Sequence, residues 1–344
     1  MTRLLMPLVF FACSFFNGTA GAAVSDDPNA MGMVTGPTTG TQIQFGRNIA
    51  TVAKTVGLNI LVKESDGSLE NIRRMDSAEN AALGIVYADA LYYLSRSEES
   101  EMRRVANRLR LVFPLYSAEA HLLARRSIHS IKDLDGKRVV AGASGSGTWL
   151  TTMNLLQLAG VRPAEILNMA PDDAVAAVLK GEVDAMFFVV GKPVALFSNI
   201  GKLVDKPELA RLKENVHFVP LNDSRLLGEY SSATIGPADY TWLTAEVPTV
   251  AVKAVLMTFD FSGGQTPYHL QRCRQLAKVG EAIRANLDQL RQTGHPKWKD
   301  VNLDAEVTIW KQDTCSNAVP VAAKAKIKPE TNIDQELKRR LLSR

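Results

Sequence analysis

The chain is short of the residues that most often mark an enzyme. Its five histidines are scattered: His121, His129, His217, His269 and His295. None stands in the His-x-x-x-His spacing of a helical metal site. A Gly-x-Ser-x-Gly nucleophile motif fails at Ser144, because position 146 is also serine. Lys137 follows a glycine but precedes Arg138, so no phosphate-binding P-loop is present. We therefore expect no enzyme activity, no metal and no cofactor.

The chain also lacks a large excess of charge of one sign. The 344 residues carry 40 basic and 36 acidic side chains, a formal net charge of +4. This is too small to indicate nucleic-acid binding. Basic residues concentrate only near the end, and we interpret residues 318–344 as a solvated basic tail rather than a binding arm.

Long hydrophobic runs are absent after the first residues. Arg3 precedes an apolar run over Leu4–Phe16, and small residues follow up to Ala22. This predicts a signal peptide over residues 1–22, cleaved near Ala22, and export to the periplasm. A membrane anchor would need a longer run, and a lipoprotein start at Cys13 has a poor context.

Cysteine is limited to three residues. Cys13 leaves with the signal peptide, so Cys273 and Cys315 remain as an even pair in an oxidising compartment. This favours a disulfide over two buried thiols.

The rest of the chain alternates strand and helix patterns, which predicts an α/β protein with mostly parallel strands. Strand-like runs cover 30–35, 58–62, 82–86, 110–124, 137–141, 183–190, 216–221 and 250–257. Helices are expected over 45–56, 69–75, 149–158 and 269–292, with Ser68 as an N-cap. The length favours two domains.

Two loops rich in glycine and hydroxyl residues, Thr38–Thr41 and Ser144–Thr148, each lie between a predicted strand and a predicted helix. Glycine lets successive N–H groups point at one spot, and a helix start adds unsatisfied N–H groups and a positive dipole end. The pair predicts a clamp for a small anion. The alternative is two tight turns with capping residues.

Five stretches, in order and spacing, resemble the TAXI-type solute-binding proteins of TRAP transporters. They are residues 35–41, 67–71 (Gly-Ser-Leu-Glu-Asn), 83–89 (Leu-Gly-Ile-Val-Tyr-Ala-Asp), 131–148 and 187–193 (Phe-Phe-Val-Val-Gly-Lys-Pro). The resemblance covers about residues 31–310. Gln42 and Tyr87 depart from the residues common in that family, and so does the basic C-terminus.

The resemblance implies a type II periplasmic-binding-protein fold. It has two lobes, each a mixed sheet flanked by helices, with the ligand in the cleft between them. Residues 30–118 and 248–317 would form lobe 1, and 119–247 lobe 2. The ligand-binding residues carried over by motif are Thr41, Gln42, Ser68, Tyr87, Ser146, Gly147, Thr148, Val190 and Gly191. Tyr116 is added because its strand is expected to cross between the lobes, where it either stacks on the ligand or fills the hinge core.

The function implied is a monomeric receptor that captures an amino acid or a keto- or dicarboxylate, such as glutamate or 2-oxoglutarate, for a TRAP permease. Nucleic acid is not expected as a partner. The alternatives are a receptor for phosphate or another small anion in an ABC transporter, a ligand sensor on a membrane kinase, and a periplasmic enzyme that reuses the fold.

Overall fold

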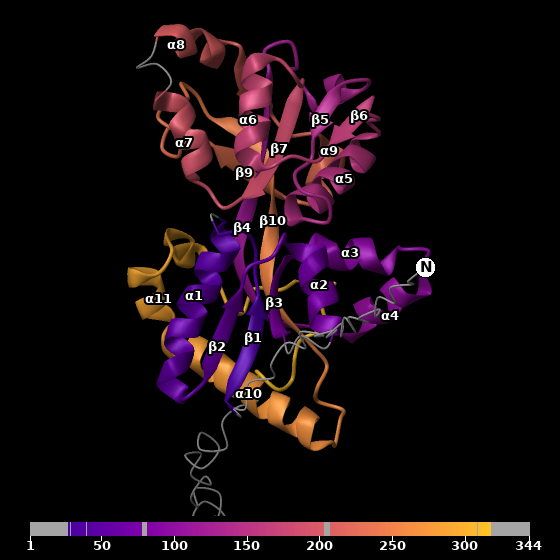
Figure 1. Cartoon of the computed structure of the whole chain (residues 1–344), viewed down its shortest axis with the longest axis vertical. Coiled ribbons are helices and arrows are strands. Elements are labelled where there is room, and N and C mark those ends of the chain that lie inside the picture. The colour runs from indigo at the N-terminus through magenta and orange to yellow at the C-terminus, as the bar shows by residue number, and fades with distance from the viewer. Residues whose placement is uncertain are drawn as a thin grey trace, which may run out of the picture.

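The chain folds into two lobes joined by two long strands (Figure 1). The structure is a computed structural model, and it describes residues 27, 29–38, 40–77, 81–202, 207–307 and 309–317. The predicted signal peptide, the basic tail and Thr39 of the first loop lie outside the described residues.

Lobe 1 takes its elements from both ends of the described chain. Its strands are β1 (Ala30–Val34), β2 (Asn59–Lys63) and β3 (Ala81–Tyr87). Its helices are α1 (Thr41–Ala53), η1 (Lys54–Val56), α2 (Ser68–Asp76), α3 (Asp89–Ser95), α4 (Ser100–Arg108), α10 (Pro267–Ala285), α11 (Leu287–Thr293) and η4 (Pro296–Asp300).

Lobe 2 is continuous in sequence. Its strands are β5 (Arg138–Val140), β6 (Glu165–Leu167), β7 (Ala185–Val190), β8 (Val216–Phe218) and β9 (Ser231–Ile235). Its helices are η2 (Ile131–Leu134), α5 (Gly147–Ala159), α6 (Pro171–Lys180), α7 (Ala195–Gly201), α8 (Pro207–Glu214) and α9 (Ser224–Leu227).

Two strands, β4 (Leu109–Arg125) and β10 (Val247–Phe259), run through both lobes and pair antiparallel with each other. The sheet order is β2-β1-β3-β10-β4-β7-β5-β6, with β9 added to β10 and β8 to β4. The lower part of β10 pairs with β3, whereas its upper part pairs with β9. The lobe boundaries predicted at 118/119 and 247/248 fall within β4 and at the start of β10.

The two-lobed α/β fold with a mixed sheet is confirmed, but three local predictions were wrong. The strands are not mostly parallel, because β4 and β10 each pair antiparallel with their neighbours. The single helix predicted over 269–292 is divided at Asn286, which leaves helical geometry between α10 and α11. Ser68 is the first residue of α2 rather than its cap, and Gly67 holds the cap position at φ 123°.

The core runs without a break through lobe 1 and the crossing strands. Its largest fully buried side chains include Phe45, Tyr116 and Trp298. The Phe45 ring stacks on Trp298 at 4.5 Å between centroids and lies 4.6 Å from Tyr116. The N-terminal half of α1 and the middle of β4 are thereby tied to η4.

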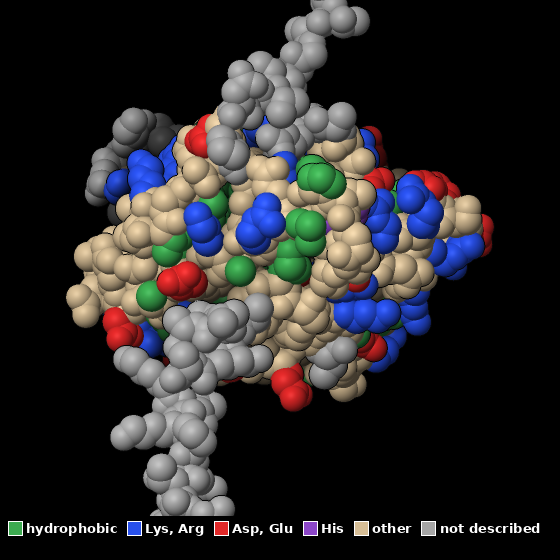
Figure 2. Space-filling model, turned by 90° about the horizontal axis from the view of Figure 1, so that it is seen from below, with side chains coloured by type: hydrophobic (Ala, Val, Ile, Leu, Met, Phe, Trp, Pro, Cys, Tyr) green, Lys and Arg blue, Asp and Glu red, His purple; other side chains and the backbone are tan. Residues whose placement is uncertain are grey.

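The predicted disulfide between Cys273 and Cys315 is present. It links α10 to the final described residues, which lie along lobe 1. Within the described chain, no helix has the length and apolar character needed to cross a bilayer. Figure 2 views the molecule from the lobe 1 end, where basic and acidic side chains are interspersed around a few apolar ones. This visible face carries no large area of one charge.

Candidate functional site

A cleft between the two lobes brings the two predicted loops together. Its cavity volume is about 130 Å³. Its walls come from α1, β3, the 140–148 segment, the start of α6 and the end of β7. They are formed by Pro37, Gly40, Thr41, Gln42, Asp66, Tyr87, Val140, Gly142, Ala143, Ser146, Gly147, Thr148, Met169, Pro171, Ala174, Met186, Phe187, Phe188 and Val190.

The lobe 1 wall contains the N-terminus of α1. Gly40 is its cap residue, and no side chain caps the first turn. The N–H groups of a first helical turn have no partner inside the helix. Gln42 also lines the cleft, and its amide lies against Gly36, where an added Cβ would be 2.6 Å from Gln42 Oε1. The backbone donors on this wall thus come from the first turn of α1, because the Thr38 and Gly40 N–H groups are bonded to Glu64 Oε1 and the Pro37 carbonyl.

The lobe 2 wall is the loop from Gly142 to Thr148. Gly142 and Gly145 have φ of 82° and 76°, which favours glycine and turns the chain into α5. The Ser146 hydroxyl accepts the Trp149 N–H at 3.1 Å and caps α5. The Thr148 hydroxyl accepts the Val189 N–H at 3.1 Å and ties this loop to β7.

The helices α1 and α5 each have 13 residues, and both begin at this cleft. Each helix start carries about half a positive charge from aligned peptide dipoles. Among the described residues that line the cleft, the single charged side chain is Asp66. The cleft therefore combines two positive helix ends with one carboxylate. Glu64 serves the first loop differently, because its Oε1 accepts the Thr38 N–H at 3.1 Å.

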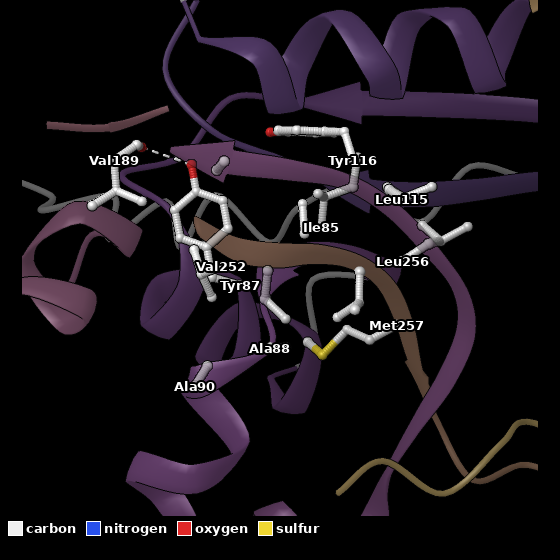
Figure 3. Packing of buried hydrophobic residues seen from close by; sticks show 14 of the residues in the cluster. Ile85, Tyr87, Ala88, Ala90, Leu115, Tyr116, Val189, Val252, Leu256 and Met257 are labelled. Atoms are coloured by element: carbon white, nitrogen blue, oxygen red, sulfur yellow. Dashed lines mark hydrogen bonds between the residues drawn. The ribbon is translucent and has the colours of Figure 1, made fainter. Parts of the chain in front are cut away.

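The lobes touch at the inner end of the cleft. The Tyr87 hydroxyl of lobe 1 donates to the Val189 carbonyl of lobe 2 at 2.8 Å (Figure 3). Beside it, the Leu69 N–H donates to the Gly145 carbonyl at 3.1 Å. A Cβ placed on Gly147 would lie 2.7 Å from the Tyr87 ring. Only glycine at position 147 permits this approach, so the lobes are in a closed arrangement.

The structure brings together most of the predicted ligand-binding residues. Seven line the cleft: Thr41, Gln42, Tyr87, Ser146, Gly147, Thr148 and Val190. Three do not: Ser68, Tyr116 and Gly191. The Ser68 hydroxyl accepts the Tyr87 N–H at 3.1 Å, so it positions Tyr87 from behind. Gly191 lies between Thr41 and the Lys297 side chain. Tyr116 is fully buried against Phe45, which matches the hinge-core alternative of its prediction.

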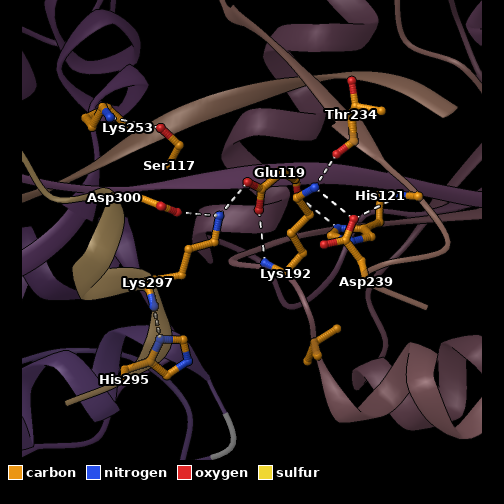
Figure 4. Close-up of polar contacts among 12 residues, drawn as sticks. Ser117, Glu119, His121, Lys192, Thr234, Asp239, Lys253, His295, Lys297 and Asp300 are labelled. Atoms are coloured by element: carbon orange, nitrogen blue, oxygen red, sulfur yellow. Dashed lines mark hydrogen bonds and ion pairs between the residues drawn. The ribbon is translucent and has the colours of Figure 1, made fainter. Parts of the chain in front are cut away.

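A buried ion pair joins the lobes at the hinge (Figure 4). Glu119, on β4, accepts a hydrogen bond from Lys297 Nζ at 2.6 Å and another from the Lys192 N–H at 3.0 Å. The Lys297 and Glu119 side chains are only 7% and 5% exposed. The Lys192 side chain points away from the cleft, because its Nζ pairs with Asp239 at 2.8 Å. Lys192 is therefore a structural residue of lobe 2.

No group of metal-binding side chains is found in the part of the chain that the structure describes. His121, a buried histidine of β4, contacts the Glu119 and Phe188 carbonyls through Nδ1 and the Tyr240 hydroxyl through Nε2. Burial lowers its pKa to about 4, so it is neutral at physiological pH. The histidine has a packing role.

Comparison with known proteins gives one family and several structural likenesses. The model of the NMT1-like family matches residues 33–305. A histidine kinase sensor domain with similarity to periplasmic binding proteins is 13% identical, with 79% of this chain and 96% of that chain covered and a TM-score of 0.44. An ancestral arginine-binding protein is 13% identical, with 79% of this chain and 96% of that chain covered and a TM-score of 0.42. The periplasmic aliphatic sulphonate-binding protein SsuA from Escherichia coli is 16% identical, with 77% and 72% covered and a TM-score of 0.37. Identities this low carry no ligand from those proteins to this chain.

Proposed function

The chain belongs to the NMT1-like family, and from that premise and the geometry of the cleft we propose that it is a receptor for a small carboxylate-bearing solute. Its two lobes close on the solute and hold it without chemical change. The observation that carries this proposal is the meeting of two 13-residue helix N-termini, those of α1 and α5, at one cleft between the lobes.

Such a cleft suits a carboxylate for electrostatic reasons. Free N–H groups and the positive ends of two helix dipoles favour a negative group without a fixed cationic side chain. The hydroxyls of Thr41 and Thr148 add donors that can rotate toward the ligand. A carboxylate bound to one lobe gains the donors of the other lobe only on closure, and this differential interaction drives the closed state.

The volume of the cavity and the charge of its walls limit which solutes it can bind. A cavity of about 130 Å³ is comparable to a cavity of about 150 Å³ that accommodates benzene, so the solute is small, with roughly six heavy atoms. Asp66 disfavours a second negative charge near it and favours an ammonium group. Among the solutes in question, this supports an amino acid over a dicarboxylate, and it disfavours the phosphate dianion. Apolar residues such as Met169 and Phe187 would contact the rest of the solute.

We propose further that the receptor is exported to the periplasm, belongs to the TAXI type and delivers its solute to a TRAP-type permease. The five ordered stretches described above support the subtype. The predicted signal peptide and the disulfide between Cys273 and Cys315 support export, because disulfides persist in oxidising compartments.

A thermal-stability screen of the purified protein tests the proposal. The panel holds amino acids, keto acids, dicarboxylates and inorganic phosphate. We expect at least one amino acid to raise the melting temperature, because a ligand that binds only the folded state stabilises it. The best solute is then titrated by calorimetry.

Two variants and a control locate the binding site. Thr148→Ala should weaken binding of that solute, while Thr293→Ala, an exposed change at the end of α11, should leave it unchanged. Asp66→Asn should reduce the preference for amino acids over dicarboxylates. If no compound stabilises the protein and Thr148→Ala alters no binding, the receptor proposal is wrong.

A further inference from the structure

A second point of contact between the lobes centres on one buried carboxylate. Asp89 is the first residue of α3 in lobe 1. Its Oδ2 atom accepts hydrogen bonds from three lobe 2 side chains: Thr151 Oγ1 at 2.8 Å, Tyr230 Oη at 2.9 Å and Asn154 Nδ2 at 3.4 Å. Thr151 and Asn154 lie on α5, the helix whose N-terminus forms the cleft. The contact therefore holds a ligand-facing helix in its closed position.

The two oxygens of this carboxylate have unequal surroundings. Oδ2 has its three donors, whereas Oδ1 is buried and has no hydrogen-bond partner among the described residues. Asp89 also lines a second interlobe cavity of about 400 Å³. A buried carboxylate oxygen without a partner is costly when the group is ionised.

We propose that closure of the lobes takes up one proton at Asp89, so that solute capture is linked to protonation. The proposal relies on lobe closure, as the proposed function does. The proton comes from solvent, and an O–H bond forms at Oδ1 while Oδ2 keeps its three donors. In the open arrangement the lobe 2 groups withdraw, and Asp89 is a solvated carboxylate at the start of α3.

The electrostatics around Asp89 agree with this. Burial raises its pKa from 3.8 to about 6, although hydrogen bonds from Thr151, Tyr230, Asn154 and its own backbone oppose the rise. The other titratable groups facing it are Tyr87, whose pKa its charge helps to raise, and the groups that share its cavity: Tyr92, Glu229, Tyr230, Lys253 and Glu306. Glu229 and Glu306 add negative charge, and Lys253 points to Ser117 Oγ at 2.9 Å.

The direction of the pH dependence of lobe closure follows from the difference in pKa between the closed and open states. The closed state has the higher pKa, about 6, and the open state has the ordinary value of 3.8. The closed state therefore binds more protons between these values, and closure becomes more favourable as pH falls through 6. For these two pKa values, the closed-to-open ratio should rise about tenfold from pH 7.5 to pH 5.

The test measures closure directly and needs no solute. Spin labels are attached at Arg47→Cys on α1 and Asp173→Cys on α6, two exposed positions in different lobes. Interlobe distances in the otherwise intact protein are recorded by pulsed electron spin resonance from pH 7.5 to pH 5. We expect the population at the short distance to grow as pH falls.

Asp89→Asn keeps the shape of the side chain but cannot take up a proton, so its distance distribution should change less than twofold over this range. The matched control is Asp313→Asn. Asp313 is also buried, with a raised pKa and an unpartnered Oδ1, but its hydrogen-bond partners, Leu111, Ser316 and Asn317, all belong to lobe 1. It should retain the wild-type pH response.

The outcomes separate this inference from the proposed function. A wild-type distribution that does not change with pH, or an Asp89→Asn variant that responds like wild type, overturns the proton linkage even if amino acids bind. A pH response that Asp89→Asn abolishes supports the linkage even if no compound in the solute panel binds.

Discussion

Gly147 gives the sharpest test of closure. It is the first residue of α5, and an added Cβ would lie 2.7 Å from two atoms of the Tyr87 ring and 3.2 Å from Ser68 Oγ. Carbon atoms in contact are about 3.5–4.0 Å apart. Gly147→Ala therefore requires the Tyr87 ring, and with it the lobes, to move apart.

The magnitude follows from the overlap. Forcing an extra methyl group into a packed contact costs about 1–3 kcal/mol. If that cost falls only on the closed state, solute affinity drops about 5- to 150-fold, since about 1.4 kcal/mol is tenfold. The open state should not suffer, because alanine stabilises a helix relative to glycine by about 0.5–1 kcal/mol.

Calorimetry measures the affinity and small-angle scattering measures compaction on ligand binding. Gly201→Ala is the control, because its new methyl group would make only ordinary contacts, at 3.4 Å or more, with Trp242 and Thr241. A Gly147→Ala protein that binds and compacts like wild type would show that the lobes do not close as described.

Three further predictions follow from other contacts. Tyr87→Phe removes one interlobe hydrogen bond, worth about 0.5–1.5 kcal/mol, and should weaken solute binding about 2- to 13-fold by calorimetry without lowering the melting temperature of the free protein. Lys297→Met leaves the Glu119 carboxylate buried without its cation and should cost about 3–5 kcal/mol in denaturant unfolding, while adding Glu119→Gln should recover much of that loss. Replacing Cys273 and Cys315 by serine opens a link with a sequence separation of 42 and should cost about 2–4 kcal/mol in the same assay; an unchanged midpoint would refute a stabilising role.

Local patterns allowed most of the fold to be predicted. Glycine and hydroxyl residues between a strand and a helix identify Thr38–Thr41 and Ser144–Thr148 without knowledge of the rest of the chain, since loop conformation depends on adjacent residues. The helical segment predicted over residues 45–56 likewise ends at residue 56, and the following Gly57 has a φ of 70°. These features need only short-range information.

Contacts between distant residues account for what was missed. Asp66 looks like any loop acid until the fold places it at the wall of the cleft. Asp89 and Tyr230 are 141 residues apart, and Glu119 and Lys297 are 178 apart. Ser68 has the residue type of a helix cap, but its hydroxyl bonds to Tyr87 of a neighbouring strand, a tertiary contact that overrides the local preference. No pattern along the chain reveals these pairings.

The crossing strand β10 has a consequence for how the chain folds. Its residues 254–257 pair with β3, which lies about 170 positions earlier, whereas its residues 247–251 pair with β9, which ends only 12 positions before β10 begins. A chain that emerges from its N-terminus can fold lobe 2 first, while β3 keeps an unpaired edge. Lobe 1 is finished only when β10 and the segment bearing Cys315 arrive. Until β10 pairs with β3, the exposed edge of β3 can pair with a strand of another chain. Conditions that slow completion of the chain should therefore favour aggregation through lobe 1.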